Sequence, residues 1–241
     1  MSNIVIKIPE IARLVYKKDS KLIEKQMRLW YPEGDIRFIY VERVDTEGFL
    51  FRKDNTVIMA FAGTNSIKDL WRDLKFFPGA YYYKNNTINN YVSQKMVIHR
   101  GFANVINQIQ LDVVEAFRDL FFFDYNWVKS VDRVVGIGHS LGASTVYGAV
   151  DILSRVFPSI LGKTQIRTFG RPNGWSHSAV KAFNDRHPDT INYVNRNDIV
   201  TKLLGFSTKA PGKDIILKSK IGIPWVTDHY MDEYLNQWGK V

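Results

Sequence analysis

The feature that most constrains this chain is the stretch VVGIGHSLGAS at residues 134–144. An apolar, β-branched run leads to Ser140, which stands between Gly138 and Gly142, and small residues follow. The run predicts a buried strand and the small residues predict a closely packed helix, so a sharp turn falls at the serine. At either glycine a Cβ would collide with the neighbouring backbone of such a turn. A strand, a tight turn and a helix in this order favour an α/β fold.

Three interpretations of this turn compete: a serine nucleophile, a plain connection, or a phosphate cradle. The cradle is excluded because no lysine opens the helix and the G-x-G-x-x-G spacing is missing. A nucleophile needs a base within reach and donors for the developing oxyanion. The helix that begins after Ser140 would direct its free amides, including that of Leu141, toward the turn. The plain turn stays open until the partners of the serine are found.

The second half of the chain alternates strands with helices. Strands are predicted at Arg133–Ile137, in TQIRTFG and in TINYVN, and helices at about Leu141–Phe157 and in SHSAVKAFNDRH. This alternation implies crossover connections and a largely parallel sheet.

The first half follows other patterns. One or two helices are expected between Ile8 and Tyr31, then an antiparallel meander from Asp35 to Gly63-Thr64, and a longer helix over Gly101–Phe121. An amphipathic pattern predicts a short helix from Ile67 to Leu74. No linker or repeat divides the chain, so residues 1–241 are expected to form one domain.

A nucleophile elbow of the α/β-hydrolase kind is followed first by an acid and then by a histidine. Asp198 lies just past a predicted strand, where a loop residue can orient an imidazole, although turn capping is the alternative. The other aspartates weighed for this role lie before that strand or near other turns: Asp189, Asp214 and Asp228. Two of the downstream histidines, His177 and His187, precede Asp198. Only His229 therefore fits the order.

Composition removes several function classes. The chain has no cysteine, which excludes disulfides, thiolate nucleophiles and cysteine-ligated metals. The net charge of +9 would suit an anionic partner, but acids interleave with the basic residues, so a solvated surface is favoured and nucleic-acid binding is not expected. No stretch reads as a signal peptide or a bilayer span. The lack of either signal favours the cytoplasm over secretion, although it does not decide the compartment. The oligomeric state also stays open.

A series of motifs in fixed order resembles the class 3 lipases, the fungal-type triacylglycerol lipase family of the α/β-hydrolase fold. The motifs are VIMAFAGT, SIKDLWRDL, HRGF, GHSLGAS, TFGRPNG, NRNDIV and the late His229. The resemblance covers most of the chain from about Asp35 onward. It implies a central, mostly parallel sheet with helices on both faces and an N-terminal antiparallel meander. It also implies Ser140 as nucleophile, His229 as general base and then acid, and Asp198 as the residue that orients the histidine.

Further roles come from the resemblance alone. Thr64 would join the Leu141 amide in an oxyanion hole, and His99 matches a structural position. Residues 66–75 would be a lid that covers the nucleophile, with its apolar side formed by Ile67, Leu70, Trp71 and Leu74. A surface helix packed permanently on the core is the alternative. Two departures from the family pattern are Ala62, where arginine is common, and Ile199, where proline is frequent.

The implied activity is hydrolysis of acyl-lipid esters, as in a triacylglycerol or diacylglycerol lipase, with no metal or organic cofactor. The implied partners are the acyl lipid itself and, transiently, a membrane or lipid-droplet surface. Three alternatives stay open: a phospholipase A1-type hydrolase, an acyltransferase with the same site residues, and a catalytically silent membrane-binding protein.

Overall fold

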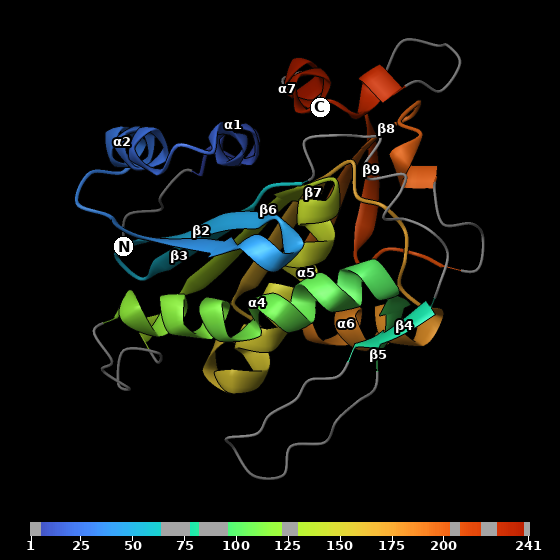
Figure 1. The fold of residues 1–241 in the computed structure, drawn as a ribbon, viewed down its shortest axis with the longest axis horizontal. Coiled ribbons are helices and arrows are strands. Elements are labelled where there is room, and N and C mark those ends of the chain that lie inside the picture. The colour runs from blue at the N-terminus through green and yellow to red at the C-terminus, as the bar shows by residue number, and fades with distance from the viewer. Residues whose placement is uncertain are drawn as a thin grey trace.

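A seven-stranded sheet forms the centre of the molecule, with helices on both of its faces (Figure 1). The computed structural model describes residues 6–63, 78–81, 96–121, 130–202, 208–217 and 226–238. The strands run in the order β1-β2-β3-β6-β7-β8-β9. Their bounds are β1 (Asp35–Val41), β2 (Thr46–Lys53), β3 (Thr56–Phe61), β6 (Arg133–His139), β7 (Thr164–Phe169), β8 (Thr190–Asn195) and β9 (Lys213–Leu217). A separate antiparallel pair joins β4 (Pro78–Tyr81) to β5 (Met96–His99).

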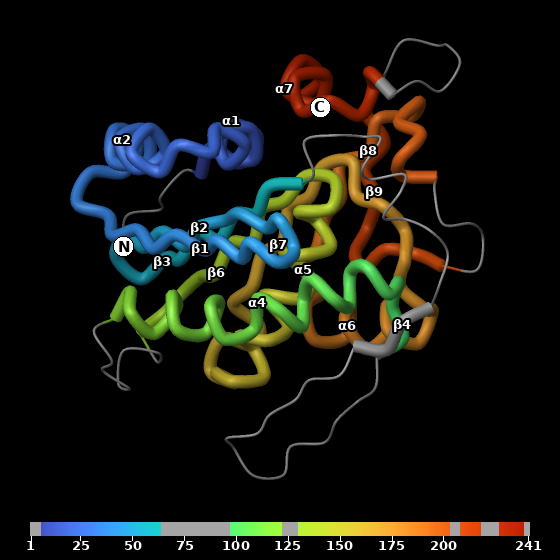
Figure 2. Tube along the Cα trace, in the orientation of Figure 1, coloured from blue at the N-terminus to red at the C-terminus, as the bar shows by residue number. Residues whose placement is uncertain are grey.

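The helices lie in two groups, one on each side of the sheet (Figure 2). The first group comprises α1 (Ile8–Leu14), α2 (Ser20–Trp30) and α7 (Met231–Trp238). The second comprises α4 (Arg100–Asp119), α5 (Leu141–Val156) and α6 (His177–Arg186). Short 3-10 turns complete the described elements: η1 (Val15–Lys17), η2 (Glu42–Val44), η4 (Pro158–Ile160), η5 (Val200–Lys202) and η6 (Val226–His229).

The sheet confirms the predicted meander followed by parallel strands. β1, β2 and β3 pair antiparallel, and β3, β6, β7, β8 and β9 pair parallel. Parallel strands bring their carboxyl ends to one edge of the sheet. At that edge Phe61 pairs with Gly138, and His139 pairs with Phe169. Residues that follow β3, β6, β7 and β8 are thereby gathered at one place.

Alternation along the central strands divides the core into two apolar clusters. Val57 and Met59 face the cluster that holds α4, α5 and α6, whereas Ile58 and Ala60 face the cluster of α1, α2 and α7. Because successive side chains point to opposite faces and both faces are covered, these strands read as continuous apolar runs. Gly136 lets α5 approach closely, since a Cβ there would lie 2.6 Å from Val146 Cγ1.

The structure differs from the sequence reading in a few places. β6 continues two residues beyond Ile137, because Gly138 and His139 still pair with β7. The sequence from Ala80 to Phe102, rich in tyrosine and asparagine, suits a hairpin or an irregular excursion, and β5 of the β4–β5 pair lies within it. Strand β9 and helix α7 were not specified from the sequence. Within the described ranges, no helix has both the length and the apolar character needed to cross a bilayer. The expectation of a single domain over residues 1–241 stays a prediction.

Candidate active site

Ser140 occupies a strained turn between β6 and α5. Its φ of 57° and ψ of −130° are unusual for a residue with a side chain, and it caps the N-terminus of α5. Such a conformation costs of order 1–3 kcal/mol and persists only where the surroundings enforce it. Here the Ser140 amide donates to Phe169 O at 3.0 Å and the Ser140 carbonyl accepts from Ala143 N–H at 3.0 Å. The backbone is therefore held from both sides of the turn.

The two flanking glycines make this turn sterically possible. A Cβ at Gly138 would lie 2.4 Å from the carbonyl oxygen of Gly142, and a Cβ at Gly142 would lie 2.3 Å from that of Phe61. Both contacts are with backbone, which cannot rotate away. The collision expected from the sequence thus applies at both positions. Only glycine, which has no Cβ, fits on either side of the serine.

Ser140, His229 and Asp198 form a continuous hydrogen-bonded series. The Ser140 hydroxyl donates to His229 Nε2 at 2.7 Å, and His229 Nδ1 donates to Asp198 Oδ2 at 2.8 Å. All three are nearly inaccessible, with 2%, 3% and 0% of their surface exposed. Because His229 Nδ1 is hydrogen-bonded to the carboxylate, Nε2 is left to accept the serine proton. The structure therefore brings together the three residues that the sequence order singled out.

The carboxylate of Asp198 is held by two further donors. Val200 N–H donates to Oδ1 at 2.8 Å, and the Tyr234 hydroxyl donates to Oδ2 at 2.5 Å. Burial, together with the negative charge and hydrogen bond of Asp198, raises the pKa of Tyr234 well above its ordinary value, so the tyrosine stays a donor. Sequence reasoning missed Tyr234; its only signal was a spacing of five residues from His229 at the start of a short helix.

Gly170 brings the main chain close to the same two side chains. Its φ is +55°, and a Cβ there would lie 2.9 Å from both Asp198 Oδ2 and His229 Nδ1. The glycine follows β7 directly, so the carboxyl end of a third parallel strand lines the site. Any side chain at this position would press on the hydrogen bond between acid and imidazole.

The other residues named from the sequence fall into two groups. Leu141 is the first residue of α5, where its amide has no partner within the helix. His99 caps α4, its Nδ1 accepting from Gly101 N–H at 3.2 Å, which fits the structural role. The oxyanion candidate and the lid lie outside the described residues: Thr64, Ile67, Leu70, Trp71 and Leu74.

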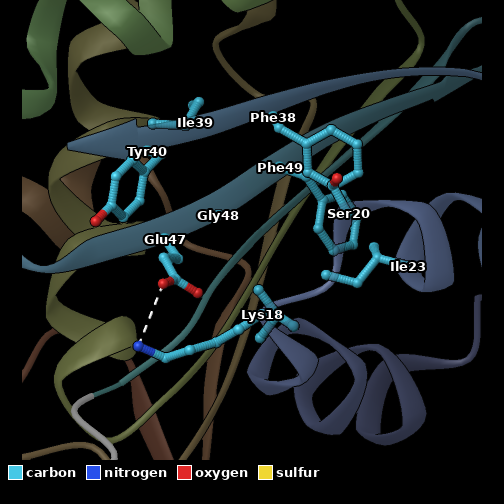
Figure 3. A pocket seen from close by; sticks show the side chains of 10 residues that line it. Lys18, Ser20, Ile23, Phe38, Ile39, Tyr40, Glu47, Gly48 and Phe49 are labelled. Atoms are coloured by element: carbon cyan, nitrogen blue, oxygen red, sulfur yellow. Dashed lines mark ion pairs between the residues drawn. The ribbon is translucent and has the colours of Figure 1, made fainter. Parts of the chain in front are cut away.

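A surface hollow of about 290 Å³ lies elsewhere, between the segment that joins η1 to α2 and the strands β1 and β2. Figure 3 shows its mixed lining, with Phe38 and Phe49 on the strands and Lys18 paired to Glu47 at 3.2 Å. None of the three hydrogen-bonded residues contributes to this lining. The hollow is therefore separate from the candidate active site.

Several solved structures that superpose on this chain are lipases. Lipase II from Rhizopus niveus superposes with a TM-score of 0.73 at 20% identity, covering 94% of this chain and 92% of its own. A triacylglycerol lipase described as having a serine protease triad as its catalytic centre gives 0.72 at 18% identity, covering 92% and 90%. The triacylglyceride lipase of Rhizomucor miehei gives 0.67 at 19% identity, covering 88% and 78%. At these identities the likeness shows the α/β-hydrolase fold.

Comparison at the level of sequence is more selective. No curated protein matches the chain significantly. The model of one family, described as lipase (class 3), matches residues 58–208, which is more than half of the 241 residues. The match spans the strained turn at Ser140 and the loop of Asp198. With this match and the lipase fold together, the chain belongs to the class 3 lipase family.

Proposed function

We propose that this protein hydrolyses the ester bonds of acyl lipids through a covalent acyl-enzyme on Ser140. Membership of the class 3 lipase family supports ester hydrolysis in general. The observation that carries the specific mechanism is the unbroken series from Ser140 through His229 to Asp198 behind a strained turn. A plain connecting turn would need neither the strain nor the buried partners.

The first half-reaction forms the acyl-enzyme. Ser140 Oγ attacks the ester carbonyl while His229 Nε2 takes its proton, and Asp198 stabilises the resulting imidazolium. The C–O bond to the alcohol then breaks as His229 returns the proton to the leaving oxygen. In the second half-reaction His229 deprotonates a water, which attacks the acyl carbon. The bond from that carbon to Ser140 Oγ then breaks as His229 returns the proton to Oγ, and the fatty acid is released.

Negative charge on the carbonyl oxygen needs donors fixed in advance. The Leu141 amide, at the positive end of α5, is one proposed donor. Thr64, two residues beyond Ala62 at the end of the meander, is the other by family resemblance. The lid over residues 66–75 is proposed on the same ground.

The proposed substrate class is neutral acyl glycerides. Hydrolysis of phospholipids and acyl transfer to an alcohol would pass through the same covalent acyl-enzyme. The test therefore includes both reactions as alternative outcomes. The net charge of +9 would suit an anionic lipid surface, so anionic vesicles are included in the test.

The test compares the parent with Ser140→Ala and a matched control, Ser144→Ala. Ser144 lies one helical turn along α5, fully buried, and its hydroxyl has no hydrogen-bond partner in the described part of the chain. Hydrolysis of p-nitrophenyl esters should fall by at least 10³-fold in Ser140→Ala and by less than threefold in Ser144→Ala. Loss in both variants, or in neither, would contradict the assignment of the nucleophile.

The same preparation separates the substrate classes. Fatty acid release is measured from triacylglycerol emulsions, from vesicles of anionic phospholipid, and from both with an added alcohol. Faster turnover of the emulsion supports the glyceride lipase, whereas faster turnover of the vesicles supports the phospholipase. An ester product in place of free acid would identify the acyltransferase, and inactivity of the parent on every ester would favour the silent membrane-binding protein.

A further inference from the structure

A second series of hydrogen bonds passes behind Ser140 and involves two side chains with no assigned role. Gly63 N–H donates to the Tyr16 hydroxyl at 3.0 Å, and Tyr16 contacts His139 Nδ1 at 2.7 Å. His139 Nε2 in turn lies 2.7 Å from the carbonyl oxygen of His229. The series therefore joins the N-terminal turn η1, the end of β3, the residue before Ser140 and the main chain of the proposed base.

The chemistry of the groups gives this series one direction. A carbonyl only accepts, so the proton of His139 must be on Nε2, and Nδ1 is then an acceptor. Tyr16 must give its proton to that nitrogen, which leaves its oxygen lone pairs for Gly63 N–H. Burial, followed by the charge of His229, lowers the pKa of His139 well below its ordinary value, and burial raises the pKa of Tyr16. Both side chains therefore stay neutral and fully bonded.

The two ends of the series lie against the reacting groups. A Cβ at Gly63 would lie 2.6 Å from the Tyr16 hydroxyl and 2.9 Å from Ser140 Cβ, so the Gly63 main chain packs directly on both. In the sequence Gly63 immediately precedes Thr64, the proposed oxyanion donor. At the other end the rings of His139 and His229 lie with centroids 4.7 Å apart.

We propose that Tyr16 and His139 are positioning residues, which fix the main chain of Gly63 on one side of Ser140 and that of His229 on the other. The inference rests on the proposed ester hydrolysis at Ser140 and assigns a role in it to the N-terminal turn. Misplacement of a catalytic group by 1 Å can cost on the order of 10²-fold in rate, so small shifts at these two points matter.

The first variant is Tyr16→Phe, which removes one hydroxyl and leaves the ring. Its matched control is Tyr31→Phe, because the Tyr31 hydroxyl also accepts a main-chain N–H, that of Lys7 at 2.8 Å, in the same N-terminal segment. Both variants should lower Tm, because Tyr16→Phe removes the hydrogen bonds with Gly63 N–H and His139 Nδ1, and Tyr31→Phe removes the one from Lys7 N–H. With a soluble short-chain ester, kcat should fall about tenfold in Tyr16→Phe with KM within twofold of the parent, and by less than twofold in Tyr31→Phe.

A second measurement follows the network without turnover. In protein labelled with ¹⁵N-histidine, the ring nitrogens of His139 should show the Nε2–H tautomer, and Tyr16→Phe should shift the ring resonances of His229. Tyr31→Phe should leave them in place. A His139→Gln variant adds a double-mutant cycle, in which the double variant should be no slower than the slower single variant.

Equal kcat in the two tyrosine variants would overturn the proposal, as would a His229 spectrum that Tyr16→Phe leaves unchanged. Failure of the proposed function looks different. In that case the parent itself hydrolyses no ester, and the ring resonances alone decide whether Tyr16 controls the position of His229.

Discussion

Gly170 offers a direct way to test how tightly the acid and the imidazole are held. In Gly170→Ala the new methyl would lie 2.9 Å from Asp198 Oδ2 and from His229 Nδ1, nearer than carbon atoms approach such groups. Neither neighbour can give way easily. The carboxylate accepts from His229, Val200 and Tyr234, and both side chains are almost fully buried.

Two costs follow, and a matched variant separates them. A left-handed backbone costs an L-residue about 1–2 kcal/mol, of which roughly 0.4–1 kcal/mol is returned through the stiffer unfolded chain. Gly162→Ala carries this cost alone, because its φ is +76° and nothing lies within 4 Å of the added Cβ. In Gly170→Ala the methyl must also push the acid and the imidazole apart. Loss of that charge-assisted bond costs about 1.5–3 kcal/mol, the equivalent of roughly 10- to 100-fold in rate.

The assay pairs urea unfolding with hydrolysis of a soluble short-chain ester. Gly162→Ala should lose no more than about 1.6 kcal/mol of unfolding free energy and keep its kcat. Gly170→Ala should lose about 1.5–3 kcal/mol more and show a kcat lower by roughly 10- to 100-fold. If kcat in Gly170→Ala stays within twofold of the parent, the site absorbs a methyl group, and the argument from packing around the acid–imidazole pair is refuted.

Two further predictions concern other buried groups. Tyr234→Phe removes one donor from Asp198 and should lower the unfolding free energy by about 1.5–3 kcal/mol and kcat by about tenfold; unchanged kinetics would show that the remaining donors suffice. Burial alone would raise the pKa of Asp151, but it is lowered from 3.8 to about 2 by contacts with His187, Arg155 and Arg186. Because the folded pKa is the lower one, about 2 kcal/mol of stability is present above about pH 4 and is lost as the pH falls toward 2. In urea unfolding between pH 4 and pH 2, Asp151→Asn should therefore lose about 2 kcal/mol less unfolding free energy than the parent. An equal loss of unfolding free energy in the parent and the variant would contradict the role of Asp151.

The parts of the fold that could be predicted are those specified by local pattern. The turn at Ser140 combines an apolar run, two glycines and small residues within eleven positions, and the meander shows turn signals between short β-rich runs. Helix α4 was predicted within a few residues because its apolar side repeats at helical spacing from Phe102 to Phe117. Strand β9 had no such signal, since only Leu217 among its five residues is buried.

The site could be predicted only as far as chain order and family motifs reach. Asp198 and His229 were singled out by following Ser140 in the required order, without any measure of distance. Tyr16 and Tyr234 carry no motif and lie 124 and 94 residues from Ser140 in the sequence, so only folding reveals their contacts. Buried hydrogen bonds of this kind join segments that are remote along the chain, and a local pattern contains no information about them.

The family match covers residues 58–208, whereas His229, Tyr234 and Tyr16 all lie outside it. Their convergence depends on α1 and α7, which pack into the same apolar cluster through Ile11, Met231 and Tyr234. An exposed ion pair between Arg13 and Asp232 at 2.9 Å adds little to this contact. The matched segment alone would therefore contain Ser140 and Asp198 but not His229, which lies between them in the hydrogen-bonded series. Residues outside the match thus complete the proposed catalytic series, and we expect the packing of α1 against α7 to support its alignment.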